Sequence, residues 1–474
     1  MTAHENTPAA IQLSADAARE TEMGLAALAA SFGSRFTSGL AQRQNHGATE
    51  GFYPRQYPEA VVFIDSTEAA SEALRICHRH RIPVIPYGAG SSLEGQLVAT
   101  KGGVSLDMSL MNRIIGVAAA DMDILVEAGV TRSALNAELR HHGLFFPVDP
   151  GADATLGGMA STRATGTTTV RYGGMRQHIL GLKVVLPTGE IVSTGGRARK
   201  SSAGYDLTSL FVGAEGTLGL VTELRLRVHG IPEEIASVIC SFVTLNAAVD
   251  AVIQSLQSGV DVARIELLDA VQMRAVNIDS KTSYPEQATL FLEFHGSPGG
   301  VAEQIEKFRL VADDCGGQDL NYAVKVEDRN RLWLARHRAY FAARALAPGK
   351  QAITTDICVP ISRLAECILV TRDEIDRAGI LGTIVGHVGD GNFHTVLMFD
   401  EGNAEEIERV KEIASQMAYR AIDMGGTCTG EHGIGLGKKK YLEKEAGPSL
   451  AVMRSIKISL DPHQIMNPGK IFDM

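Results

Sequence analysis

The sequence PYGAGSSLEG (86–95) directly follows an apolar, strand-like segment, PVIPYG (83–88). Its glycines and alanine leave the backbone uncovered, so successive N–H groups can converge on an anion, and Ser91 and Ser92 add hydroxyl donors. The spacing G-x-G-x-x-x-x-G is neither the G-x-G-x-x-G of dinucleotide-binding folds nor a P-loop. Taken alone, the stretch fits a phosphate-binding loop or a tight turn between strands.

Two further glycine-rich segments occur in the same half of the chain. The first, DPGADATLGGMASTRATG, runs from Asp149 to Gly166 and leads into RYGG (171–174), and the second, GAEGTLGLVT, runs from Gly213 to Thr222. The first is too long for a turn, and its composition is not that of a flexible linker. Three such segments indicate one extended cofactor that lies across several loops.

The composition excludes several classes of protein. The 474 residues are 45% hydrophobic and 21% charged, which excludes a disordered, collagen-like or disulfide-scaffold protein. The formal net charge of −10 argues against a nucleic-acid partner, because nucleic-acid-binding proteins carry a basic surplus. No stretch approaches about 18 uncharged apolar residues, so we expect no transmembrane segment. The N-terminal residues lack the pattern of a secretory signal, and the six cysteines are widely spaced. We therefore expect a cytoplasmic location, with peripheral membrane association left open.

Changes in the pattern of expected strands, helices and glycine loops along the chain predict four parts and an α+β fold. These are a helical lead-in (1–50), a region of short strands and glycine loops (51–230), a region of strands and longer helices on an antiparallel sheet (231–403), and a mostly helical end (404–474). Helices are expected at Thr67–His80, behind a Ser66 cap, and at 245–257. A hairpin is expected to turn at Thr188-Gly189.

A second group of reactive residues lies near the C-terminus. GHVGDGNFH places His387 and His394 around Asp-Gly-Asn, a hairpin turn signal that lets both imidazoles face the same side. GEHGIG then adds Glu431 and His432. Two imidazoles and a carboxylate suit a divalent metal, although hydrogen-bonded core histidines beside a turn fit the spacing as well. The basic run GKKKY (437–441) is expected to be a solvated helix start.

The three glycine segments, in this order, resemble the FAD-binding domain of the vanillyl-alcohol oxidase / p-cresol methylhydroxylase superfamily, and the likeness extends to the C-terminus. Within it, the chain is most similar to the group of FAD-dependent D-lactate dehydrogenases, glycolate oxidase flavoprotein subunits and D-2-hydroxyglutarate dehydrogenases. The resemblance implies an FAD domain of two subdomains, an antiparallel-sheet substrate domain and a helical C-terminal region that returns to the FAD domain. Some members bind flavin covalently through a histidine of the first loop. Because no histidine occurs between His80 and His141, we expect dissociable FAD.

The resemblance also assigns the cofactor contacts. The segment 86–95 would wrap the pyrophosphate, 155–166 would run along the pyrophosphate and the flavin, and 215–221 would hold the adenine and ribose. The expected contacts are Pro86, Gly88, Ala89, Gly90, Ser91, Ser92, Gly95, Asp149, Pro150, Gly157, Gly158, Ser161, Thr162, Thr165, Gly166, Tyr172, Glu215, Gly216, Gly219, Val221 and Asn467.

For the histidine and glutamate residues near the C-terminus, the resemblance implies that His387, His394 and Glu431 hold Zn²⁺ or Mn²⁺. The metal would lower the pKa of a substrate hydroxyl, and His432 would take the proton while hydride passes to flavin N5. A fourth metal ligand is the alternative role for His432. Arg336, on an expected helix that continues to Phe341, falls where the family binds the substrate carboxylate, and a planar guanidinium suits that contact.

Two departures from the D-2-hydroxyglutarate dehydrogenases bear on the substrate. Thr354 and Val396 stand about where those enzymes have lysine and asparagine, so a second carboxylate would lose its partners. This favours D-lactate or a larger apolar D-2-hydroxy acid. We expect an FAD- and metal-dependent D-lactate dehydrogenase that passes electrons to a cytochrome, a quinone or an electron-transfer flavoprotein, with a homodimer left open. The alternatives are a D-2-hydroxyglutarate or glycolate dehydrogenase, an oxygen-using oxidase, or a non-catalytic flavoprotein subunit of a larger complex.

Overall fold

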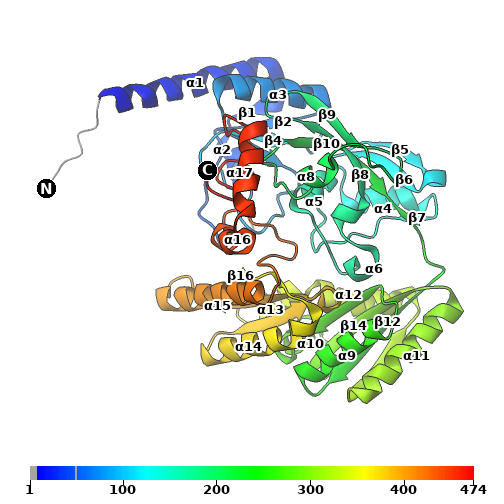
Figure 1. Ribbon diagram of the computed structural model, residues 1–474. Coiled ribbons are helices and arrows are strands. Elements are labelled where there is room, and N and C mark those ends of the chain that lie inside the picture. Colours follow the sequence, from blue (N-terminus) through cyan, green and yellow to red (C-terminus); the bar gives the residue numbers. More distant parts are fainter. Residues whose placement is uncertain (1–7, 49–50) are drawn as a thin grey trace.

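The computed structural model describes residues 8–48 and 51–474, which form an upper glycine-rich half and a lower half built on one large sheet (Figure 1). The upper half contains two sheets. The first has the order β1-β2-β4-β3, from β1 (Phe36–Thr37), β2 (Ala60–Phe63), β4 (Val104–Asp107) and β3 (Val84–Tyr87), with β2 and β3 parallel to β4. The second is antiparallel in the order β5-β6-β10-β8-β9, from β5 (Ile114–Ala118), β6 (Asp123–Glu127), β10 (Leu220–Arg227), β8 (Ile179–Val185) and β9 (Ile191–Gly195).

Eight α-helices lie in the described part of this half. They are α1 (Pro8–Phe32), α2 (Leu40–His46), α3 (Thr67–His80), α4 (Arg132–Arg140), α5 (Leu156–Thr162), α6 (Thr169–Tyr172), α7 (Met175–His178) and α8 (Leu207–Phe211). Helix α3 has the predicted bounds, and the Ser66 hydroxyl caps it by accepting from Ala69 N–H. The predicted hairpin is the β8–β9 pair, which turns through Gly189 at a φ of +84°. A small pair, β7 (Leu144–Phe145) with β11 (His229–Gly230), ends this half.

The lower half confirms the expected antiparallel sheet. Its path is β15-β12-β14-β13-β18-β19-β16, from β15 (Gly317–Ala323), β12 (Glu234–Phe242), β14 (Ala288–Gly296), β13 (Arg264–Leu268), β18 (Gly382–Gly386), β19 (Asn392–Phe399) and β16 (Gln351–Thr354), and β17 (Ile357–Cys358) pairs with β19. Its helices are α9 (Leu245–Gln257), α10 (Ala270–Ser280), α11 (Pro298–Asp314), α12 (Val326–His337), α13 (Ala339–Ala345), α14 (Leu364–Arg377) and α15 (Ala404–Asp423).

One helix expected to be continuous is broken. The segment that should have run through to Phe341 ends as α12 at His337 and restarts as α13 at Ala339, because Arg338 turns out of helical geometry (ψ +4°). The Arg338 guanidinium is held by both carboxylate oxygens of Asp279 on α10 at 2.7 and 2.8 Å. The break lets α12 and α13 line the same cavity.

The C-terminal segment returns to the upper half. Helices α16 (Lys439–Ala446) and α17 (Ser449–Leu460) are drawn in red, and α17 lies against the upper half (Figure 1). Beyond them, Met466 is buried in the upper core and pairs with Val84, and Asn467 N–H donates to the Val84 carbonyl at 2.7 Å. The chain end therefore reaches the strand that leads into the first glycine loop. Within the described residues, no helix combines the length and apolarity that crossing a bilayer requires.

Candidate functional site

A cavity of about 1070 Å³ lies where the two halves meet. It exceeds the roughly 300–1,000 Å³ of most small-ligand pockets, so it has room for a dinucleotide and a small substrate together. All the predicted FAD contacts except Gly95 and Tyr172 line this cavity. Gly95 instead packs beside Tyr53 and Leu436, and the Tyr172 hydroxyl is bonded to His295 Nδ1 at 2.8 Å, on the lower half.

The first glycine loop presents uncommitted backbone donors to the cavity. Strand β3 ends at Tyr87, and the N–H groups of Gly88, Ala89, Gly90 and Ser91 donate to no other described residue. Gly90 has a φ of +76°, and a Cβ there would lie 2.5 Å from the Tyr87 hydroxyl. Consecutive free N–H groups without side chains above them form an anion site, so the loop fits a pyrophosphate.

The predicted metal ligands converge on one point. His387 follows β18, and His394 lies on β19 opposite Val385, so the tight turn at Gly391 (φ +77°) brings the rings to a centroid distance of 5.4 Å. Glu431 arrives on the loop between α15 and α16. Its Oε1 is 3.4 Å from His387 Nε2 and 3.2 Å from His394 Nε2.

Contacts at the Nδ1 atoms of His387 and His394 orient the two imidazole rings. His394 Nδ1 lies 3.1 Å from the Thr355 carbonyl, which can only accept, so Nδ1 carries a proton and Nε2 is the nitrogen turned towards Glu431. His387 Nδ1 lies 2.6 Å from Glu266 Oε1. The buried His394 Nε2 has no hydrogen-bond partner among the described residues. A ring nitrogen and a carboxylate oxygen can face each other across a proton or a metal cation, and acceptors behind each imidazole are typical of metal-binding histidines. The residues therefore fit a divalent metal.

Charge favours the ionised form of Glu431. Burial alone would raise its pKa, but the neighbouring His387 and His394 hold the pKa of the Glu431 carboxyl well below its ordinary value. An ionised carboxylate is the form that binds a metal.

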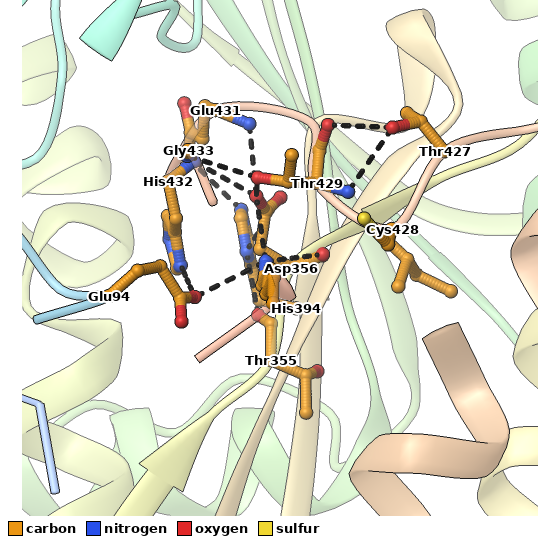
Figure 2. A network of polar contacts seen from close by, with 12 residues as sticks. Glu94, Thr355, Asp356, His394, Thr427, Cys428, Thr429, Glu431, His432 and Gly433 are labelled. Atoms are coloured by element: carbon orange, nitrogen blue, oxygen red, sulfur yellow. Dashed lines mark hydrogen bonds and ion pairs between the residues drawn. The ribbon is translucent and has the colours of Figure 1, made fainter. Parts of the chain in front are cut away.

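Asp356 belongs to a second group of possible ligands, but its carboxylate is already occupied. Ligand atoms of Asp356, His394 and His432 lie within 4.8 Å of one another. Asp356 Oδ2, however, accepts from the N–H groups of Glu431 (3.0 Å) and His432 (2.9 Å), and Lys438 Nζ lies 3.4 Å away (Figure 2). Asp356 thus shapes the loop that carries Glu431 and His432.

His432 lies beside the metal candidates and lines the cavity. Its ring stacks on His394 at a centroid distance of 5.2 Å, and its Nδ1 lies 3.5 Å from Glu94 Oε1 (Figure 2). Burial lowers the pKa of His432, but Asp356 and Glu94 outweigh it and leave the pKa above the ordinary value. The imidazole is therefore a better proton acceptor than a free histidine.

Arg336 lines the cavity with two of its five N–H donors already used. Its Nε and Nη2 donate to Glu266 Oε2 at 2.8 and 2.6 Å, while Nη1 donates to no other described residue. A guanidinium has five N–H donors, so the Nη1 end stays available for a carboxylate. Thr354 and Val396 are cross-strand partners on β16 and β19, and both line the cavity.

Four charged residues were missed by sequence reasoning: Glu94, Glu266, Asp356 and Lys438. The run 437–441 was expected to be a solvated helix start, and α16 does begin at Lys439, but Lys438 itself is not solvated. Lys438 is 7% exposed, and its Nζ lies 2.9 Å from the Asp356 carbonyl and 3.2 Å from Glu94 Oε1. A signal existed for two of the others. Glu266 in ARIELLDA and Asp356 in AITTDICVP are single acids within apolar, strand-like stretches. Charges in such places are rarely fully buried unless they are paired.

Family models match both halves of the chain. The FAD binding domain model matches residues 58–195, and the model of the C-terminal domain of FAD linked oxidases matches residues 231–471. The chain belongs to the FAD-linked oxidases. Among relatives of this FAD-linked oxidase, the "probable D-lactate dehydrogenase, mitochondrial" of Danio rerio is 49% identical over 92% of this chain and 88% of its own. The "D-lactate dehydrogenase [cytochrome], mitochondrial" of Arabidopsis thaliana is 45% identical over 92% and 77%.

A solved structure extends the likeness to the fold. The FAD-linked oxidase shares its fold with p-cresol methylhydroxylase, with a TM-score of 0.79, 16% identity and coverage of 96% of this chain and 97% of the other. The expected α+β fold is confirmed, and so is the expected similarity to FAD-dependent D-lactate dehydrogenases. The relatives' names place them in mitochondria, so the cytoplasmic location expected for this oxidoreductase stays a prediction.

Proposed function

We propose that this FAD-linked oxidase is a metal-dependent D-lactate dehydrogenase, which oxidises D-lactate to the 2-oxo acid. One observation carries the proposal: the cluster of His387, His394 and Glu431, with His432 and Arg336 beside it, lines the same cavity as the glycine loops. The names of the two relatives support the choice of substrate. Zn²⁺ and Mn²⁺ both suit two imidazoles and a carboxylate.

Each side chain has a role that follows from its contacts. Arg336, held by Glu266, binds the substrate carboxylate through its Nη1 end. His387, His394 and Glu431 would hold the metal, which would supply charge at the substrate hydroxyl. His432 accepts the hydroxyl proton. Bound FAD supplies the acceptor for the α-carbon hydride, and the bound metal supplies charge that favours loss of the hydroxyl proton.

The remaining wall selects the substrate. Val396 and Val385 present apolar surface to the cavity, and Thr354 offers one short hydroxyl. A methyl group can lie against Thr354, Val385 and Val396 without leaving a charge unpaired, whereas a second carboxylate placed against these three residues would find no cation among them. The pocket therefore favours D-lactate over D-2-hydroxyglutarate.

The FAD is proposed to be dissociable, since no histidine lies in or near the first glycine loop between His80 and His141. A cytochrome is the proposed electron acceptor, in line with the name of the Arabidopsis relative. A quinone and an electron-transfer flavoprotein are the alternatives.

The test is reduction of the bound flavin without oxygen. Purified holoenzyme is mixed anaerobically with D-lactate, L-lactate, glycolate, D-2-hydroxyglutarate or D-mandelate, and bleaching of the flavin is followed. D-lactate is expected to bleach the flavin fastest. Preference for D-2-hydroxyglutarate or glycolate would retain the chemistry and contradict the substrate, and no bleaching by any acid would contradict the activity.

A further inference from the structure

Glu266 contacts two side chains of the proposed site but does not itself line the cavity. It lies on β13 in the middle of the lower sheet, and its side chain is fully buried. Each of its oxygens serves a different partner. Oε1 accepts from His387 Nδ1 at 2.6 Å, and Oε2 accepts from Nε and Nη2 of Arg336 at 2.8 and 2.6 Å.

We propose that Glu266 is a positioning residue that sets both anchors of the substrate at once, the metal ligand His387 and the carboxylate-binding Arg336. The inference rests on the proposed function. Through Oε1, Glu266 keeps the His387 proton on Nδ1 and so turns the Nε2 lone pair towards Glu431. Through Oε2, it holds one edge of the guanidinium and leaves the Nη1 end for the substrate. One rigid carboxylate thereby fixes the distance between hydroxyl and carboxylate binding, which suits a 2-hydroxy acid.

Glu266→Gln tests this proposal because it replaces one of the two hydrogen-bond acceptors with a donor. An amide has one accepting oxygen and one donating NH₂ group. Either Arg336 or His387 must then face a donor. If the oxygen stays with Arg336, the NH₂ group faces His387 Nδ1 and favours the tautomer with its proton on Nε2, which cannot bind a metal.

The matched control is Glu293→Gln on the neighbouring strand β14. Glu293 is also buried and pairs with a histidine and an arginine, namely His295 (2.7 Å) and Arg264 (3.4 Å), but neither partner belongs to the proposed site. Loss of stability alone should therefore affect both variants alike.

The experiment measures Mn²⁺ affinity of the FAD-loaded protein by equilibrium dialysis, and KM and kcat for D-lactate at saturating Mn²⁺. For E266Q we expect a Kd for Mn²⁺ raised roughly 10–100-fold, the range for lost second-layer contacts. We also expect a raised KM with a smaller change in kcat. E293Q should keep wild-type values for all three. A global defect would instead lower FAD retention and kcat together.

Wild-type Kd and KM in E266Q, with FAD retained, would overturn the inference and leave the proposed function intact. A wild-type enzyme that bound neither Mn²⁺ nor D-lactate would overturn the proposed function and this inference with it. If E266Q does not retain FAD, E266D serves in its place, because it keeps two accepting oxygens on a side chain one methylene shorter. A wild-type Kd for Mn²⁺ and a wild-type KM for D-lactate in E266D would then contradict the proposal that Glu266 must contact His387 and Arg336 at the same time.

Discussion

The two sides of the cavity recognise their ligands by different means. The upper side offers backbone N–H groups of small residues such as Gly88 and Gly90. The lower side offers imidazoles, carboxylates and a guanidinium, each held from behind by a buried partner such as Glu266 or Asp356. The upper side depends on backbone conformation and space, whereas the lower side depends on charge and proton position.

The two sides are also joined through acids of the glycine loops. Glu215 accepts from the N–H groups of Ile434 and Gly435 at 2.7 and 2.8 Å, and Glu94 lies against His432 and Lys438. Loops that line the cofactor side therefore also hold the loop that carries the acid–base residues. Substitutions on each side should separate cofactor binding from chemistry, and substitutions at the junction should affect the stability of the whole.

The largest effect is expected for His432→Ala. Removing the proton acceptor should slow flavin reduction by D-lactate by roughly 10²–10⁴-fold, the usual contribution of general base catalysis. FAD should stay bound, because the glycine loops are untouched. Anaerobic stopped-flow measurement of flavin bleaching checks this, and near-normal reduction would remove His432 from the chemistry.

The next effect concerns the metal. Glu431→Gln and His394→Ala should each weaken metal binding and lower D-lactate oxidation together, because each removes one of three ligands. Elemental analysis of dialysed protein, beside the activity of the same sample, measures both. The exposed Glu72→Gln on α3 is the control. Full activity in a metal-free variant would exclude a catalytic metal.

On the upper side, Gly90→Ala should weaken FAD binding about tenfold, since a left-handed non-glycine residue costs about 1–2 kcal/mol and the new Cβ would press on Tyr87. Once saturated with FAD, the variant should bind metal normally. Gly116→Ala is the matched control, because that exposed glycine has a negative φ and nothing within 4 Å of its added Cβ. Fluorescence titration of the apoprotein with FAD gives both affinities, and equal affinities would contradict the assignment of this loop.

Substrate choice should respond to Thr354→Lys. A cation at this wall should raise the ratio of kcat/KM for D-2-hydroxyglutarate to that for D-lactate by about tenfold, equivalent to about 1.4 kcal/mol. Gln351→Lys, on the same strand but not lining the cavity, should leave the ratio unchanged. An unchanged ratio in T354K would place the substrate tail elsewhere.

The smallest effect is a pH dependence of stability. Burial raises the pKa of Glu215 to about 7 from an ordinary value of 4.5. The folded protein keeps a proton there that the unfolded chain releases, so this contribution is fully present below pH 4.5 and is lost as pH rises through 7. Thermal unfolding of wild type and Glu215→Gln between pH 5 and 8 should show that the Tm of wild type falls by a few degrees relative to that of the variant as pH rises, because only the wild type titrates at this position. A wild-type Tm that rises relative to that of the variant with pH would contradict this sign.

Local patterns in the sequence were enough to predict the parts that depend on local structure. The capping residue Ser66 predicted the start of α3, and the Asp-Gly-Asn sequence predicted the hairpin that joins His387 to His394. The glycine loops were recognised by composition, and nearly all their residues line the cavity. Glu266 and Lys438 could not be placed this way, because their partners are distant in sequence and only the tertiary fold brings them together. The partner of Arg338 at the break, Asp279, likewise lies on another helix.

The most direct test of the central claim is reversible removal of the metal from the FAD-loaded enzyme. After EDTA treatment and gel filtration, the protein is mixed anaerobically with D-lactate, and then with D-lactate after addition of Mn²⁺ or Zn²⁺. The account predicts that the FAD stays bound, that D-lactate no longer bleaches it, and that added metal restores bleaching by D-lactate but not by L-lactate. Undiminished bleaching in metal-free protein would contradict the claim that His387, His394 and Glu431 form a catalytic metal site.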